Sequence, residues 1–226
     1  DAIKGKLKPE TSKTYEAGWR FRGNEIEGVL SLYHVNFKDR LLTISSGPAI
    51  VSSTSVLANV GDVESNGLDA GINWKFARKW AWFNSLSLNS TEYKQDYLDG
   101  TTTRAVSGKQ VVGIPQQMFK TELAYDDGAW FSRLGGDYTS KRYYTYTNDN
   151  STDARWLWNL GAGYRARNVS FFKDLTIQVN VTNLFDRQYI STVGTGGFSY
   201  SDPAGTDQTL MVGAPRQIFL NVTGKF

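Results

Sequence analysis

Residues 174–189 read DLTIQVNVTNLFDRQY, and the first half of this stretch alternates between apolar and polar side chains. The apolar positions are Leu175, Ile177, Val179 and Val181, and the polar positions between them are Thr176, Gln178, Asn180 and Thr182. A period of two predicts a β-strand with one apolar and one polar face, which ends where the alternation breaks at Asn183. The apolar face meets either a protein core or lipid, and one strand alone does not decide between them.

The same period of two recurs along the rest of the chain. It is visible in residues 15–21, 26–37, 68–76, 80–89, 119–125, 130–138, 155–165 and 217–226. In 26–37 apolar residues change from one face to the other, which predicts a bulge or register change near Tyr33. No helical period is present. The sequence therefore predicts an all-β fold, an antiparallel meander of about nine strands.

The connections between these segments alternate in length. Short turns are expected at 23–24, 78–79, 126–128 and 166–173, and long loops at 41–59, 93–115, 143–153 and 186–214. In an antiparallel meander, alternate connections lie at opposite ends of the strands. One rim therefore has tight turns and the other long loops, as in outer-membrane barrels with periplasmic turns and extracellular loops. A soluble sandwich with crossing connections has no reason to keep this order.

The tryptophans lie near the ends of the expected strands. Five are close to short turns and two follow a long loop: Trp19, Trp74, Trp80, Trp82, Trp130, Trp156 and Trp158. Aromatic rings gather in this way at the two interfaces of a membrane barrel, whereas a sandwich core places large side chains at mid-strand. We therefore expect the aliphatic faces to contact acyl chains and the polar faces to line a wet interior, the lumen.

Composition excludes several kinds of site. The 226 residues include no cysteine and one histidine, His34, so no disulfide, thiol nucleophile or histidine-cluster metal site is expected. The net charge of +3 is spread over both signs, which argues against a nucleic-acid surface. No catalytic constellation is visible, so we expect neither an enzyme nor a resident cofactor.

Four stretches resemble a known family. They are LKPETSKTYEAGWRF (7–21), NVGDVESNGLDAGINWKF (59–76), NVTNLFDRQY (180–189) and GAPRQIFLNVTGKF (213–226). In this order they are similar to late barrel strands of TonB-dependent outer-membrane receptors, including the Asn-Leu-Phe-Asp-x-x-Tyr segment and the final strand that ends in an aromatic residue. Asp69 stands where glutamate is common in that family.

The resemblance implies the C-terminal part of a transmembrane barrel of about 22 strands, in the outer membrane of a Gram-negative bacterium. Residues 1–226 would supply roughly the last nine strands, as a mature product or a fragment. The plug domain, the TonB box and the N-terminal strands are absent from this chain and would come from other residues. The implied partners are outer-membrane lipid, the plug and N-terminal strands, the TonB complex and the barrel-assembly machinery.

Two sites are candidates for function. The loop KRYYTYTNDNSTD (141–153) offers Arg142, Tyr143, Tyr144 and Tyr146 as ligand contacts, because a cation and phenol rings suit an anionic iron chelate. Its alternative role is an aromatic girdle at the membrane boundary. For Phe226 the resemblance implies an assembly signal, and its alternative role, compatible with the first, is the last girdle aromatic.

The function implied is energy-dependent uptake of a scarce nutrient, most often a ferric siderophore. Oligosaccharide and cobalamin are alternative cargoes within the same family. A soluble β-sandwich that binds carbohydrate through exposed aromatic rings is an alternative of another class. An outer-membrane hydrolase is not expected, because the chain has a single histidine, His34, and no matching constellation of serine or aspartate.

Overall fold

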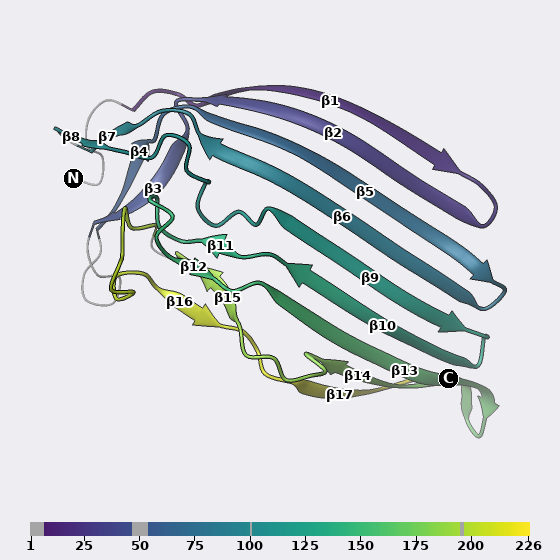
Figure 1. Ribbon diagram of the computed structural model, residues 1–226. Helices are drawn as coiled ribbons and strands as arrows, with labels where there is room; N and C mark the ends of the chain where they lie inside the picture. Colours follow the sequence, from purple (N-terminus) through teal and green to yellow (C-terminus); the bar gives the residue numbers. More distant parts are fainter. Residues whose placement is uncertain (1–6, 47–53, 100, 195–196) are drawn as a thin grey trace.

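The computed structural model describes residues 7–46, 54–99, 101–194 and 197–226. Nine strands form one sheet, and each pairs antiparallel with the next (Figure 1). They are β1 (Thr11–Arg22), β2 (Ile26–Lys38), β5 (Val63–Ala77), β6 (Trp80–Tyr93), β9 (Gln117–Asp126), β10 (Trp130–Thr139), β13 (Arg155–Val169), β14 (Phe172–Thr182) and β17 (Gln217–Lys225). The predicted all-β meander is confirmed. Within the described ranges, no helix has the length and apolar character of a membrane span.

The alternation of connections is confirmed too, since tight turns lie at one end of the sheet and long loops at the other (Figure 1). Each long loop also contains a small antiparallel hairpin. The hairpin strands are β3 (Leu41–Ser46) with β4 (Thr54–Asn59), β7 (Tyr97–Asp99) with β8 (Thr102–Arg104), β11 (Arg142–Tyr143) with β12 (Ser151–Thr152), and β15 (Ile190–Val193) with β16 (Leu210–Val212). Most of these strands are too short to show a period in the sequence.

The bulge predicted near Tyr33 is wrong. Tyr33 pairs with Glu16 on one side and Gly67 on the other, within an unbroken register. The mixed pattern of β2 has another cause, because the strand extends beyond the apolar band. In this extension the inward-facing Phe37 packs against the buried cluster of the loops. On the outward face, Nδ1 of His34 lies 2.7 Å from Oδ1 of Asn66.

The turn predicted at 166–173 is shorter than expected. Pairing continues through Arg167 with Asp174 and Val169 with Phe172, so only Ser170 and Phe171 turn the chain. Cross-strand pairing overrides the weak local pattern of this segment. The irregularity in the main sheet lies instead between β5 and β6, near Ala77.

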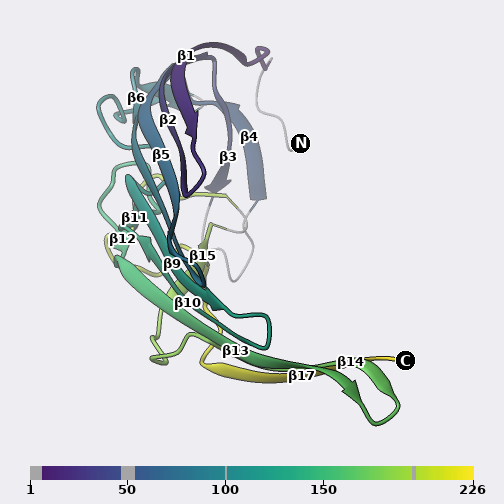
Figure 2. The same cartoon turned by 90° about the vertical axis from the view of Figure 1, so that its right-hand side faces the viewer.

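The two faces of the sheet differ as the period of two predicts. One face is apolar and open, with Leu32 52%, Ile177 42% and Trp130 60% exposed. No second sheet packs on it among the described residues, so the soluble β-sandwich is excluded. The sheet is strongly curved (Figure 2), and its polar face is hollowed.

Candidate functional site

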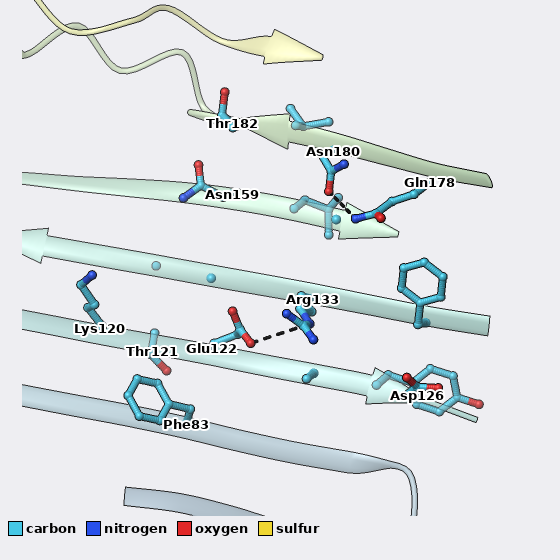
Figure 3. Close-up of a pocket in the computed structure, with 18 of the residues that line it drawn as sticks. Phe83, Lys120, Thr121, Glu122, Asp126, Arg133, Asn159, Gln178, Asn180 and Thr182 are labelled. Atoms are coloured by element: carbon cyan, nitrogen blue, oxygen red, sulfur yellow. Dashed lines mark hydrogen bonds and ion pairs between the residues drawn. The ribbon is translucent and has the colours of Figure 1, made fainter. Parts of the chain in front are cut away.

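A cavity of about 700 Å³ lies on the polar face of the sheet, against β6, β9, β10, β13 and β14. Figure 3 shows charged and amide side chains from β9, β10, β13 and β14 pointing into it, and the ring of Phe83 from β6. The polar residues of the opening stretch line it as predicted: Thr176, Gln178, Asn180 and Thr182. This face is therefore the lumenal wall, and it presents hydrogen-bonding groups together with some apolar surface, such as the rings of Phe83 and Phe131.

Charges on the lumenal wall are largely paired. Lys120 Nζ lies 3.5 Å from Asp137 Oδ1, and Arg133 Nε lies 4.0 Å from Glu122 Oε1. At the short-turn rim, Arg165 donates two hydrogen bonds to the Asp126 carboxylate, at 2.8 and 3.0 Å. Such exposed pairs contribute little to stability, because water and dissolved salt screen the attraction between the charges. Because each pair joins one cation and one carboxylate, these charges cancel and the surface of the wall remains polar.

The buried core of the chain lies among the long loops rather than under the sheet. Its fully buried members are Val60, Val63, Tyr93, Tyr97, Val106, Val111, Val112 and Tyr146. Half-buried side chains from the first and last long loops pack against it, among them Ile44 and Phe198. All four long loops therefore contribute to one core, and we call their described residues within 39–62, 93–116, 140–154 and 186–214 the loop cap.

Backbone hydrogen bonds join the loops of the cap to one another. Phe198 N donates to Thr43 O at 3.2 Å, which links the last loop to the first. Tyr146 N donates to Ser199 O at 3.1 Å, which links the last loop to the third. These loops therefore hold each other in place, and moving one requires breaking bonds to its neighbours.

Two carboxylates hold the third and last loops: the exposed Asp149 joins one loop to the other, and the buried Asp202 fixes a turn within the last loop. Asp149 accepts hydrogen bonds from the hydroxyls of Thr145 and Ser201, one on each loop. Although burial opposes the shift, these hydrogen bonds hold the pKa of Asp149 below its usual value, so it is ionised near neutral pH. Asp202 is 1% exposed and accepts backbone N–H bonds from Thr206, Asp207 and Gln208.

Asn183 closes the base of the longest loop, at the break in the opening stretch. Its Nδ2 donates to Arg187 O at 2.9 Å and to Ala214 O at 3.1 Å, and its Oδ1 accepts from Arg187 N at 2.8 Å. The side chain is buried, and its φ of +49° is one that asparagine tolerates better than most residues. The motif Asn-Leu-Phe-Asp thus ends β14 by joining the two ends of the loop.

Replacing Asn183 with alanine is expected to loosen the loop 187–214. Three backbone groups lose their partner, and one buried group left unpaired already costs about 1–3 kcal/mol. Asn180→Ala is the matched control, because Asn180 lies on the same strand and faces the hydrated lumenal wall. Limited proteolysis should cut the loop faster in Asn183→Ala alone. Equal cleavage of both variants contradicts this role.

The structure does not bring the four candidate ligand residues to one surface. Tyr146 lies in the core of the cap, and Tyr144 is 8% exposed. Arg142 and Tyr143 are half-buried neighbours on β11, so their side chains point to opposite faces. The Oη of Tyr143 accepts a hydrogen bond from Lys141 Nζ at 2.8 Å. Contact with cargo stays a prediction for all four, and for Tyr146 it requires the loops to separate first.

Phe226 lies at the short-turn rim of the sheet. Its ring stacks on Phe171 at 5.9 Å between centroids and lies 5.2 Å from the Phe172 ring. These three rings form an aromatic cluster beside the turn between β13 and β14. The placement agrees with the girdle role, and the assembly role stays a prediction.

Sequence reasoning missed several residues of the cap. The proximity of Arg142 to Arg155, which both donate to Ile190 O, could not be foreseen because these residues belong to different strands. Most valines of the core lie in loops, where no period marks them as buried, and Val63 is the first residue of β5. Only a cluster of valines and tyrosines in segments expected to be polar could have indicated a second core.

The curved sheet with a polar wall and a rim of packed loops can now be compared with known proteins. The sequence profile described as "TonB dependent receptor-like, beta-barrel" matches residues 2–184. The chain belongs to this family of TonB-dependent receptors. Its members are outer-membrane proteins of Gram-negative bacteria.

Relatives in sequence are distant but cover almost the whole chain. An uncharacterized TonB-dependent receptor of Haemophilus influenzae is 24% identical over 99% of this chain and 62% of its own length. The ferric-pyoverdine 358 receptor of Pseudomonas putida is 27% identical over 92% of this chain and 25% of its own length. The receptor chain thus spans less than two thirds of each relative.

Solved structures confirm the fold of this part of the receptor. The ferric yersiniabactin uptake receptor FyuA from Yersinia pestis superposes with a TM-score of 0.70 at 19% identity, over 94% of this chain and 29% of FyuA. The copper transporter OprC superposes with a TM-score of 0.71 at 18% identity, over 96% of this chain and 31% of OprC. Both show the nine-stranded sheet as a C-terminal part of a larger barrel.

Proposed function

We propose that the chain is part of an outer-membrane receptor that imports a ferric siderophore, and that it has no enzymatic activity. The observation that carries this proposal is the hydrated lumenal wall beneath a packed loop cap, in a chain of this family. The wall offers a polar path across the membrane, and the cap controls access to it from one end. In this arrangement the short turns are periplasmic and the cap is extracellular.

The cargo is inferred from the relatives and from the cap. Relatives named for ferric pyoverdine and for ferric yersiniabactin uptake favour an iron chelate. Arg142 and Tyr143 add a cation and a phenol near the path, groups that suit an anionic chelate. The structural likeness to a copper transporter makes a copper complex the second candidate. Oligosaccharide and cobalamin remain cargoes to be tested alongside.

The partners follow from the open sheet. β1 and β17 are the end strands of the sheet, and we propose that the remaining strands of the same receptor pair with both. A plug domain would occupy the hollow of the lumenal wall, and the TonB complex would supply energy through that plug. We further propose that Phe226, in the aromatic cluster at the periplasmic rim, is read by the barrel-assembly machinery.

The proposal is tested by iron uptake in the native host. We expect deletion of the gene to abolish uptake of at least one ⁵⁵Fe-labelled siderophore under iron limitation, and the intact gene to restore it. Loss of TonB should have the same effect. The panel should contain hydroxamate, catecholate and carboxylate chelates, together with a copper complex, cobalamin and a maltooligosaccharide. Gene-dependent uptake of one of the last three, with none of any iron chelate, contradicts the proposal.

A further inference from the structure

Two arginines converge at the junction of β11, β13 and β15. Arg142 Nη2 donates to Ile190 O at 3.0 Å and to Ser191 O at 3.3 Å, and Arg155 Nη1 donates to the same Ile190 O at 2.5 Å. The Arg155 guanidinium also lies 4.7 Å from the centre of the Tyr189 ring. Because both guanidinium groups reach one oxygen atom, one small anion can reach both of them.

The positive charge at this junction has no acidic partner among the residues that the structure describes. Within the described ranges no carboxylate forms an ion pair with Arg142 or Arg155, and the bonds that they make are to neutral carbonyl groups. Arg142 Nε is buried and donates to no described protein atom. Burial, and then the charge of Arg155, lower the pKa of Arg142. Both side chains are half-buried, and two like charges held close together in such a setting repel each other unless an anion compensates them.

Other cations of the chain behave differently. Arg133 on the lumenal wall faces Glu122, and Arg40 at the edge of the cap donates to Glu10. Lys120 is paired with Asp137. These three cations therefore have carboxylate partners, which the two arginines that share the Ile190 carbonyl lack among the described residues.

We propose that Arg142 and Arg155 form an anion-binding site that takes carboxylate or phosphate oxygens. Guanidinium groups bind such oxygens in pairs with charge-assisted hydrogen bonds, and few of the N–H groups here are used by the protein. Tyr189 forms one side of the site and keeps the Arg155 side chain in place. An iron chelate with free carboxylates has the oxygens that this site would bind. The physiological role of the site therefore rests on the proposed function.

The test is equilibrium dialysis of the intact outer-membrane protein in detergent at low ionic strength. The probes are radiolabelled citrate and inorganic phosphate, without iron. We expect saturable binding of at least one probe. Arg142→Gln and Arg155→Gln are each expected to weaken it about tenfold or more, and the double variant should abolish it. Arg133→Gln, the matched control on the lumenal wall, should bind within about twofold of the unchanged protein.

Citrate binding alone identifies a carboxylate site, and binding of phosphate identifies a general oxyanion site that phosphorylated lipid can also fill.

Folding is checked in each variant by heat-modifiable migration in SDS gels. If a glutamine variant does not fold, Arg142→Lys and Arg155→Lys replace it, because they keep the charge and remove the planar pair of donors. Absence of saturable binding, or equal affinity in the double variant, overturns the proposal. Siderophore uptake is measured separately. If the variants lose anion binding, the anion-binding site is supported even when no iron chelate is imported. Conversely, if the double variant imports iron normally, the transport function stands. The dialysis result alone then shows whether the two arginines bind anions.

Discussion

Replacing Tyr146 with alanine is expected to destabilise the loop cap by about 3–5 kcal/mol, the usual cost of removing a large buried aromatic ring. Tyr146 has no exposed surface, and its ring packs against Tyr93 and Tyr97, each at 5.7 Å between centroids. Phe198 of the last loop meets it edge to face at 6.5 Å. Because loops from four parts of the chain share this core, the cavity weakens all of them together.

The measurement is hydrogen exchange of cap amides in the intact receptor. Protection in residues 106–112 and 143–147 should fall roughly a hundredfold or more, since each 1.4 kcal/mol corresponds to about a factor of ten. Exchange in β10 and β13 should not change. Loss confined to the third loop, with the second and last loops unaffected, contradicts a shared core.

Tyr146→Phe is the matched control and should leave the cap as stable as before. The Tyr146 hydroxyl is buried and has no hydrogen-bond partner in the described structure, so its removal also removes an unfavourable burial. Burial raises the pKa of this phenol well above its usual value, so the hydroxyl is neutral at any ordinary pH. Destabilisation by Tyr146→Phe equal to that by Tyr146→Ala would show that the hydroxyl, and not the ring, holds the cap.

Residues 1–226 expressed alone are not expected to form a stable monomer in detergent or lipid. The described sheet ends at β1 and β17, and neither strand has a partner on its outer edge. In hydrocarbon each unsatisfied backbone group costs several kcal/mol, and a row of them exceeds the whole stability of a typical domain. Only closure of the barrel removes both edges.

This is checked by refolding the chain and the intact receptor side by side in the same detergent. The intact receptor should give a heat-modifiable, protease-resistant band, and the isolated chain should aggregate or be digested. A compact monomer of residues 1–226 with protected β1 and β17 amides would contradict the argument. It would mean that the two edges pair with each other or with another chain.

The sequence by itself determined the strands and the distribution of polarity across them. Period two requires only that neighbouring side chains point to opposite faces, so Ile177 and Gln178 could be assigned to an apolar and a polar face without any knowledge of neighbouring strands. The alternation of short and long connections, and the aromatic rings near strand ends, then distinguished a membrane barrel from a soluble sandwich. These are local properties, and the structure confirms them.

Only the tertiary structure decided how the loops pack and which charges meet. Val106 and Tyr146 are 40 positions apart in the printed sequence, and no period in either loop indicates that both are fully buried in one core. Arg142 and Arg155 lie on different strands and meet through the carbonyl of Ile190, a main-chain atom that every residue type carries. Contacts of this kind depend on the path of the chain between elements, and that path is set by the summed packing of four loops rather than by any local pattern.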